Sequence, residues 1–339
     1  MYRDTKSSDF SNKDKKAYFF GEEIEPIKKE LTLKYPISRG IIQDWDLMEK
    51  IWGYILYRLS KAPEECNVML TEPVINASDQ AEKMMQIMFD TFNISGFHIT
   101  YPAFLSFYST GKLTGIAVDS GESLTQYLAV LEGFEFFPGR KDLIEFGGQD
   151  LTGYLLRLMK EIQSIPIDKE KDIAKQVKEK ACYVSLDYMG ELKHVEPFEY
   201  KLPDNTSIII KEQRIKCCEA LFNPYLAGID YDENIVEYCN NCIKKYDFNS
   251  RYDLYSNIVL SGGNTMFEGF RERFTEKIKY LAGDNYGKVV NVVAPPEKNL
   301  AAVNGGCILS SLSDFQKMWI TRNEYQESGA SIVYRKKLI

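Results

Sequence analysis

Apolar residues return every three or four positions in several long stretches of the chain. Between residues 41 and 59 this spacing predicts an amphipathic helix with Asp44 as its N-cap. A second helix is expected from about residue 78, and methionines dominate its apolar face. This face carries Met84, Met85, Met88 and Phe92. Methionines at such spacing can line a ligand pocket, but they more often form core. Further helices are predicted at residues 151–162, 168–183, 267–281 and 300–319.

Short apolar runs bounded by glycine and polar residues predict strands. Residues 115–118 and 124–130 are expected to form a strand, a glycine-containing turn and a returning strand. Further strands are predicted at 207–211 and 258–260. Strands that alternate with helices define an α/β protein. No low-complexity linker divides the chain, so we expect its domains to exchange the chain rather than follow one another.

The composition narrows the possible functions. The 339 residues are 44% hydrophobic and 27% charged, and 42 basic against 49 acidic side chains give a net charge of −7. This balance argues against direct nucleic-acid binding. No apolar run approaches the roughly 18 residues of a membrane span, and the polar start of the chain does not resemble a secretory signal. Seven scattered cysteines fit a reducing compartment, the cytoplasm or the nucleus.

The turn after residue 118 is the first candidate site. It reads Asp119-Ser120-Gly121-Glu122-Ser123. Backbone amides of a tight glycine-bearing turn can hold a phosphate, and a carboxylate at the strand end can orient a hydrated divalent cation. An ordinary hairpin turn is the alternative.

A second candidate site follows the strand at 258–260, where Gly262 and Gly263 separate the strand from a helix. Such a connection can be a nucleotide platform or a turn that needs glycine for its geometry alone. On the charged helix, Lys178 and Glu179 could reach a ribose or a base, or could lie on a solvated helix face.

The cysteines and histidines favour neither a metal site nor a hydrolase. Cys239 and Cys242 form one CxxC pair in a helical stretch with no second pair, and the chain has only His98 and His194. A structural zinc site normally needs four nitrogen or sulfur ligands. Neither histidine lies near a nucleophile-elbow pattern.

Six segments follow one another at characteristic spacing: LTLKYP with WDLMEKIW, AVDSGES, VKEKACYVSLD, IVLSGGNTMF, APPEKN and FQKMWITRNEYQESGASIVYRK. In their order and nearly constant spacing, from about Gly21 to Lys337, they resemble the actin family. The resemblance implies the fold shared by actin, hexokinase and the heat-shock chaperone ATPase, with two α/β lobes around a nucleotide cleft. Residues 1–109 with 301–339 would form an incomplete outer lobe. Residues 110–300 would form the inner lobe, with an insertion at about 146–230.

The resemblance also implies the residues of an ATP or ADP site. The residues at matching positions are Asp119, Ser120, Gly121, Glu122, Gly148, Lys178, Glu179, Gly262, Gly263, Met266 and Phe267. Asp119 would orient a Mg²⁺ or Ca²⁺ ion through water. Phe267 stands where the family usually has tyrosine, so it can stack but lacks the hydroxyl donor.

Departures from the family pattern concern hydrolysis. The family opens with a phosphate-binding hairpin and a lysine, whereas sixteen polar residues and residues 17–20 precede Gly21 here. That loop, its aspartate and lysine, and the outer loop that docks the next filament subunit are expected to be absent. Pro102 and Gln126 occupy the places of the glutamine and histidine that position the attacking water, and Asn299 replaces a lysine beside the adenosine loop.

Each such loss costs on the order of 10²-fold or more in phosphoryl transfer. We therefore expect weak nucleotide binding and negligible hydrolysis, with no catalytic residues. Filament formation is also in doubt, because residues 227–233 replace the family's apolar plug loop, and the carboxylates of Asp230, Asp232 and Glu233 in this segment would oppose burial. An apolar groove for an amphipathic partner helix is implied by Tyr108, Leu309, Leu312 and Met318, which could equally be core.

These features predict an actin-like cytoskeletal or scaffold protein that acts through protein partners, either amphipathic helices or a multi-subunit assembly, in the cytoplasm or nucleus. One alternative is an ATP-binding, polymerising actin with ATPase activity whose missing hairpin is supplied in another way. The other is a truncated actin-derived product without independent function, because missing strands would expose a sheet edge.

Overall fold

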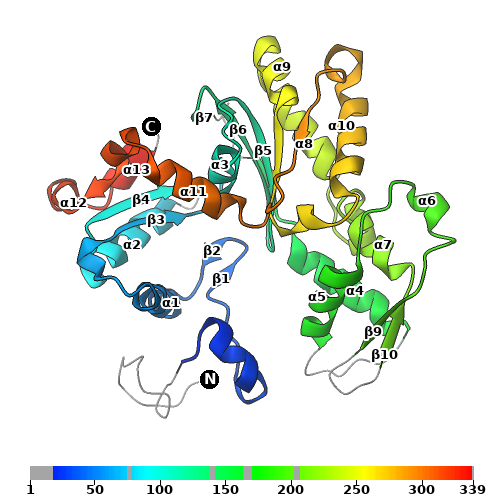
Figure 1. The fold of residues 1–339 in the computed structure, drawn as a ribbon, viewed down its shortest axis with the longest axis horizontal. Helices are drawn as coiled ribbons and strands as arrows, with labels where there is room; N and C mark the ends of the chain where they lie inside the picture. Colours follow the sequence, from blue (N-terminus) through cyan, green and yellow to red (C-terminus); the bar gives the residue numbers. More distant parts are fainter. Residues whose placement is uncertain (1–17, 75–77, 137–141, 163–169, 202–206, 338–339) are drawn as a thin grey trace. The chain divides into compact units, whose positions relative to one another are not determined.

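The computed structural model describes residues 18–74, 78–136, 142–162, 170–201 and 207–337. The chain forms two compact units (Figure 1). Unit 1 comprises residues 1–70, 77–99 and 317–339, and unit 2 comprises residues 71–76 and 100–316. Each unit is therefore assembled from separate stretches of the sequence. The lobe boundaries implied by the resemblance stay a prediction.

Helices and strands alternate along the described residues. The helices are α1 Trp45–Arg58, α2 Ser78–Gln86, α3 Pro102–Tyr108, α4 Gly148–Lys160, α5 Glu170–Ala181, α6 Tyr188–Glu191, α7 Gln213–Glu219, α8 Ile235–Lys244, α9 Phe248–Ser256, α10 Phe270–Tyr286, α11 Ala301–Ser311, α12 Arg322–Ser328 and α13 Ile332–Lys337. The strands are β1 Ile37–Ser38, β2 Ile41–Ile42, β3 Asn67–Thr71, β4 Gly96–Thr100, β5 Gly115–Ser120, β6 Thr125–Leu131, β7 Phe134–Phe136, β8 Asp142–Ile144, β9 Phe198–Lys201, β10 Ser207–Ile210, β11 Ile258–Ser261, β12 Val292–Val293 and β13 Ile320–Thr321. No helix among these residues is both long enough and apolar enough to cross a bilayer.

Local sequence signals set most of these boundaries. Asp44 caps α1 as predicted, because its Oδ1 accepts the Leu47 N–H at 2.9 Å. The expectation of a helical block over 300–319 is wrong in its second half. After α11 the backbone of Leu312 is extended (ψ 137°), and a 3₁₀ turn at Asp314–Met318 leads into β13.

Unit 1 is built on a three-stranded sheet in the order β13-β4-β3. Every residue of the central strand β4 is buried. The methionines predicted on the α2 face are core, since Met84, Met85 and Met88 are at most 4% exposed and pack in one cluster with Phe97 and Ile99. The ligand-pocket alternative for these methionines is therefore not supported.

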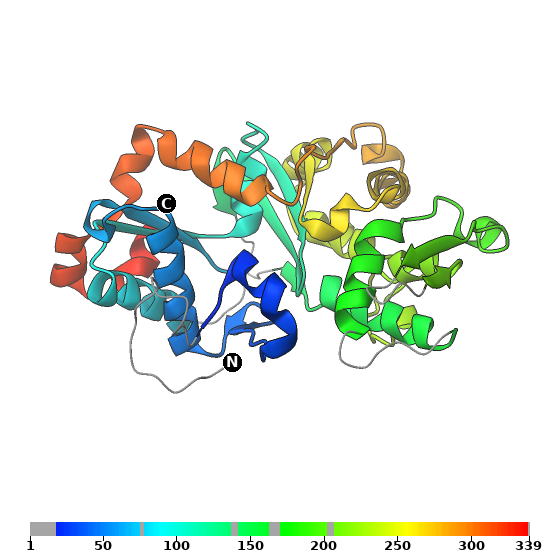
Figure 2. The same cartoon turned by 60° about the horizontal axis from the view of Figure 1, so that its bottom comes forward.

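Unit 2 is built on a six-stranded sheet in the order β12-β11-β5-β6-β7, with β8 also paired to β6. The predicted strand–turn–strand is present as the antiparallel pair β5–β6, whereas β11 runs parallel to both β5 and β12. In Figure 1, α8 and α10 lie to one side of β5 and β6. Figure 2 shows α4 and α5 near the antiparallel strands β9 and β10, and the Tyr200 hydroxyl of β9 donates to Gln176 of α5 at 2.6 Å.

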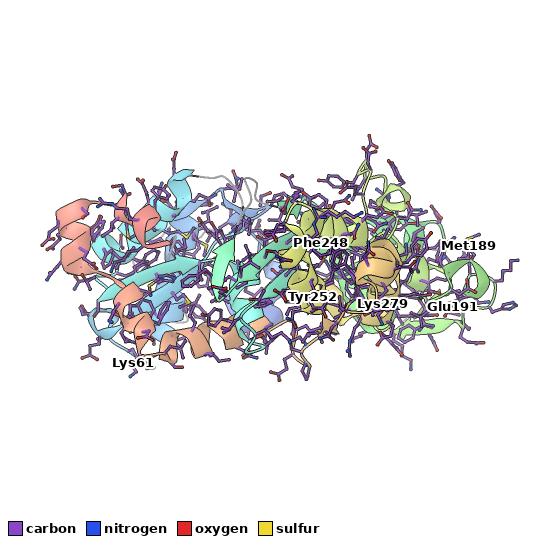
Figure 3. All side chains as sticks on the ribbon, turned by 90° about the horizontal axis from the view of Figure 1, so that it is seen from above. Lys61, Met189, Glu191, Phe248, Tyr252 and Lys279 are labelled. Carbon is purple, nitrogen blue, oxygen red and sulfur yellow. The ribbon has the colours of Figure 1, made fainter. Side chains whose placement is uncertain are left out.

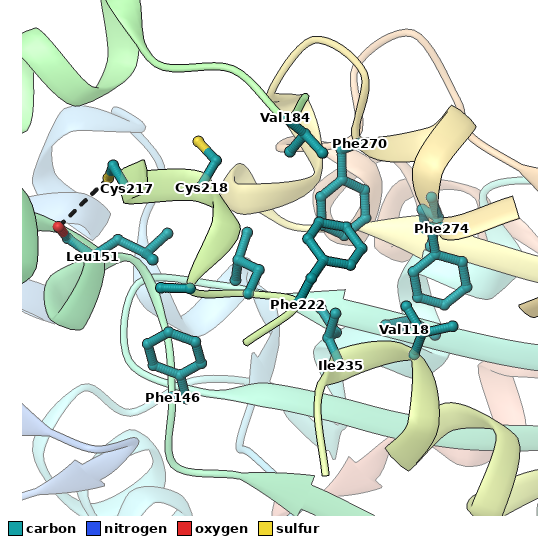
Figure 4. Close-up of a cluster of buried hydrophobic side chains, with 14 of the residues drawn as sticks. Val118, Phe146, Leu151, Val184, Cys217, Cys218, Phe222, Ile235, Phe270 and Phe274 are labelled. Atoms are coloured by element: carbon teal, nitrogen blue, oxygen red, sulfur yellow. Dashed lines mark hydrogen bonds between the residues drawn. The ribbon is translucent and has the colours of Figure 1, made fainter. Parts of the chain in front are cut away.

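Aromatic and aliphatic side chains from the sheet and its helices form one core in unit 2 (Figure 4). Phe270 and Phe274 of α10 are fully buried near Val118 of β5. In the same core, the Cys217 thiol of α7 donates to the Leu151 carbonyl of α4 at 3.6 Å. The core thus fixes α4, α7 and α10 relative to the strands that carry the candidate loops.

His98 of β4 is a buried polar residue in the core of unit 1. Its ring is 6% exposed, its Nδ1 lies 3.4 Å from the Met318 carbonyl, and the Trp319 ring stands edge-on to it. Burial, helped by the charge of Lys336, lowers the pKa of His98 to about 4, although the hydrogen bond with the Met318 carbonyl opposes the shift.

The folded state of unit 1 is therefore expected to lose stability as the pH falls from 6.5 to 4, because in this window the unfolded chain binds a proton at His98 and the folded chain does not. The loss should reach about 3 kcal/mol. Denaturant unfolding followed across this range should show it in the wild type and not in His98→Phe. His194→Gln controls for the loss of an imidazole as such, and an equal pH dependence in His98→Phe would contradict the account.

Candidate functional site

The two glycine-bearing loops of unit 2 meet because β5 and β11 are parallel neighbours. Ser261 at the end of β11 is in register with Asp119 at the end of β5. The carboxyl ends of adjacent parallel strands lie at one edge of a sheet, where ligands of open α/β sheets usually bind. The pairing therefore places both predicted phosphate and adenosine loops at one edge.

Gly262 allows the closest approach between the loops. Its φ of +87° is in the region that favours glycine, and a Cβ at this position would stand 2.3 Å from the Ser120 carbonyl oxygen. Its N–H donates to the Lys298 carbonyl at 3.1 Å, which joins the segment before α11 to the same place. Gly263, by contrast, has open space around its missing Cβ.

Asn264 ties the two loops together with its side chain. Its Nδ2 donates to the Gly121 carbonyl at 2.8 Å and to the Ser120 hydroxyl at 3.1 Å. Ser120 is fully buried, and its hydroxyl also shares a 2.9 Å hydrogen bond with Thr125. The Ser120 side chain is thus occupied within the protein.

The start of α4 closes the site from a third direction. The Gly148 N–H donates to the Gly121 carbonyl at 3.0 Å, and the Gln149 N–H donates to the Glu122 carbonyl at 2.7 Å. Gly147 is also required, since its Cβ would lie 2.6 Å from the Glu122 carbonyl oxygen. Carbonyls of the β5–β6 turn therefore hold the first amides of this helix.

Lys178 of α5 supplies a buried cation. Its side chain is 4% exposed, its Nζ donates to the Gly148 carbonyl at 2.7 Å, and it lies 3.9 Å from the Glu122 carboxylate. A Cβ on Gly148 would stand 2.7 Å from Glu122 Oε2, 3.0 Å from Asn264 Oδ1 and 3.1 Å from Lys178 Nζ. The structure thus brings residues from all three predicted motifs to one point.

Asp119 places a carboxylate at the end of β5. Burial raises the pKa of this carboxyl group, and the Ser261 hydroxyl, which donates to its Oδ1 at 2.9 Å, opposes the shift. A nearby cation would favour the charged form of Asp119.

Three other predicted site residues are not among the described contacts that join the two glycine-bearing loops, the start of α4 and Lys178. Glu179 is exposed on α5, Met266 is 45% exposed, and Phe267 is half-buried against the core. Their predicted contacts with a nucleoside stay predictions.

The predicted partner groove divides between the units. In unit 2, Tyr108 is half-buried and Leu312 is 44% exposed. Met318 belongs to unit 1, where it is half-buried. Leu309 is only 6% exposed on α11, which packs against α3, and Gly305 of α11 has no room for a Cβ beside the Leu105 carbonyl. The core alternative therefore describes Leu309 better than a groove does.

The CxxC cysteines are both buried on α8. In the part of the chain that the structure describes, no three histidine, cysteine or acidic side chains could hold a metal ion together.

The sequence analysis did not assign three residues that help to build the site. Asn264 follows Gly263 in the second candidate site, but its hydrogen bond to the Gly121 carbonyl depends on the pairing of β11 with β5 and joins residues 143 positions apart. The Lys298 carbonyl receives the Gly262 N–H, and Lys175 lies 3.9 Å from Glu122, one helical turn before Lys178. The i, i+3 spacing of the two lysines was the available signal.

Loops at the ends of adjacent parallel strands, a helix start and a buried lysine thus lie together at one edge of the sheet in a mixed α/β protein, an arrangement typical of nucleotide sites. The family model described as Actin matches residues 3–338. The chain therefore belongs to the actin family, and its α/β content agrees with an actin-like fold.

The two adjacent glycines provide a direct test of the site's geometry. Gly262→Ala should destabilise unit 2 by about 2 kcal/mol or more, because alanine resists the positive φ and its Cβ meets the Ser120 carbonyl. Gly263→Ala, which meets no atom within 4 Å, should stay within about 0.5 kcal/mol of the wild type. Chemical denaturation compares the two, and equal effects would contradict the close approach at Gly262.

Proposed function

We propose that this chain is an actin-like cytoskeletal or scaffold protein that retains part of an ATP or ADP site, hydrolyses little or no nucleotide and acts through protein partners. The observation that carries the proposal is the environment of Gln126. This residue stands where the family places its water-positioning histidine, and its side chain is 5% exposed. Its Oε1 accepts the Val74 N–H at 2.6 Å, so this oxygen is engaged with the backbone.

Pro102 supports the same conclusion at the second water-positioning place. It is the first residue of α3, a position that suits proline because the missing N–H has no intrahelical partner there. Its ring offers neither a donor nor an acceptor to a water molecule. With a neutral amide at residue 126 and a proline at 102, general-base assistance and water positioning are both weakened.

Nucleotide binding is supported by what the site retains. The buried amine of Lys178 suits an acceptor atom of a nucleotide, and the loop at Gly262 and Gly263 suits a nucleoside. Asp119 would hold a hydrated Mg²⁺ or Ca²⁺ ion through water, and such an ion would neutralise phosphate charge when bound. Burial raises the pKa of Asp119, and a bound cation would favour the charged form of this carboxylate.

The acidic side chains of Asp230, Asp232 and Glu233, in the segment 227–233, support the proposal that the protein does not form the filament contacts of the family. The Tyr225 hydroxyl donates to Asp232 at 3.2 Å, and the Asn241 amide donates to Glu233 at 2.9 Å. These bonds hold the carboxylates against unit 2, and burial of such charges between subunits is costly. We place the protein in the cytoplasm or nucleus, with no direct contact to nucleic acid or membrane.

Hydrolysis is tested with a fluorescent ATP analogue and with phosphate release, beside a conventional actin. Binding should be detectable and phosphate release should be at least about 100-fold slower than in the conventional actin. Phosphate release at the rate of the conventional actin would refute the proposed function.

Lys178→Met should weaken binding of the ATP analogue about tenfold or more, whereas Lys175→Met, whose side chain is 50% exposed, should weaken it less than threefold.

Assembly is tested by sedimentation after addition of salt and Mg²⁺-ATP. The protein should stay in the supernatant under conditions that pellet a conventional actin, because three carboxylates occupy the plug segment. The triple variant Asp230→Ala, Asp232→Ala, Glu233→Ala measures the contribution of charge. Pelleting of the wild type as ordered filaments would favour the polymerising alternative.

A further inference from the structure

A cavity of about 400 Å³ opens in unit 2 between the start of α8, one side of α10 and the segment before α6. Among its lining residues are Leu186, Glu237, Arg273, Lys277, Tyr280 and Leu281. None of the residues proposed to bind nucleotide lines it. Its volume is in the range of small-molecule sites.

Arg273 forms a charge-compensated floor of the cavity. It is 8% exposed, and its guanidinium pairs with the Glu219 carboxylate at 2.6 Å and donates to the Ser185 carbonyl at 2.6 Å. The same group lies over the Phe222 ring, 4.8 Å from the ring centroid. The charge of Arg273 is therefore satisfied without a ligand.

Lys277 stands one helical turn further along α10 and is not compensated in this way. Its amine lies 5.5 Å from the centroid of the Phe222 ring. Within the described ranges, no carboxylate oxygen is recorded within 4 Å of this amine. Burial and the neighbouring Arg273 lower the pKa of Lys277, although Glu219 and Glu237 counteract part of the shift. An anion placed beside Lys277 would relieve this cost.

The other groups of the lining decide what kind of anion fits. The Glu237 carboxylate accepts the Asn234 N–H at 3.0 Å and so serves its own helix start. Glu276 is exposed. Leu186, Tyr280 and Leu281 supply the apolar part of the lining, and Asn234 also lines the cavity. Leu186 and Tyr280 are 58% and 85% exposed, and Leu281 is half-buried. Solvent-exposed apolar groups beside a half-buried cation suit a ligand that carries both features.

We propose that this cavity binds a free organic anion in which a carboxylate or sulfonate, paired with Lys277, is attached to an aromatic or branched aliphatic body that packs against Leu186, Tyr280 and Leu281. The alternative is a half-buried lysine that is hydrated in place and binds nothing. The proposal and this alternative differ in one expected result, namely whether an anion with an apolar body specifically slows chemical modification of the Lys277 amine. Lys279, which is exposed on the same helix and does not line the cavity, is the matched control (Figure 3).

The first experiment uses the unmodified full chain and the probe 8-anilinonaphthalene-1-sulfonate. Reductive methylation of each lysine is followed by mass spectrometry with and without saturating probe. The probe should slow methylation of Lys277 about fivefold or more and leave Lys279 within twofold, because a paired ammonium releases its proton less readily. Equal slowing at both lysines, or none at Lys277, would overturn the proposal.

The second experiment separates the charge contribution from general apolar binding. N-phenyl-1-naphthylamine is the same probe without its sulfonate, so the ratio of the two affinities reports the ion pair. Lys277→Met should reduce this ratio about tenfold, and Lys279→Met should leave it unchanged. An unchanged ratio in Lys277→Met would overturn the proposal even where the variants differ in stability, since both probes report on the same folded molecules.

Discussion

The parallel pairing of β5 with β11 is the constraint on which the candidate nucleotide site depends. Asp119 and Ser261 are in register across this pair; β11 ends at Ser261, and β5 ends one residue after Asp119, at Ser120. A slip of one residue would reverse the direction of every side chain in β11 and separate Asn264 from Gly121. The close approach of Gly262 to Ser120 is possible only in this register.

Electrostatics explain what this arrangement can and cannot do. Lys178 is buried beside the Gly148 carbonyl and the Glu122 carboxylate, and burial raises the pKa of Asp119. Phosphate oxygens and a cation would complement both groups. Hydrolysis needs in addition a polarised water molecule. The side-chain oxygen of Gln126 already accepts a hydrogen bond from the Val74 N–H, so it is engaged within the protein. The proposed nucleotide binding and the proposed loss of hydrolysis therefore rest on different side chains of unit 2.

The sequence predicted features that depend on local chemistry. Asp44 caps α1, and the glycine turn after Asp119 joins two antiparallel strands, because both signals act within a few residues. Patterns alone did not reveal tertiary partners. The charged composition of α5 favoured a solvated face, yet Lys178 is buried because its amine reaches the Gly148 carbonyl. The resemblance implied that Leu309 lines a partner groove, but it could not show that α11 packs against α3 and leaves Leu309 only 6% exposed.

Hydrogen exchange with and without ADP tests the central claim most directly. If the loops of β5 and β11 hold nucleotide together with the start of α4, ADP should slow amide exchange in peptides that cover residues 119–123, 147–150 and 262–266. Peptides from α9, which carries no predicted site residue, should exchange at unchanged rates. Protection confined to other segments, or none at saturating ADP, would contradict the account.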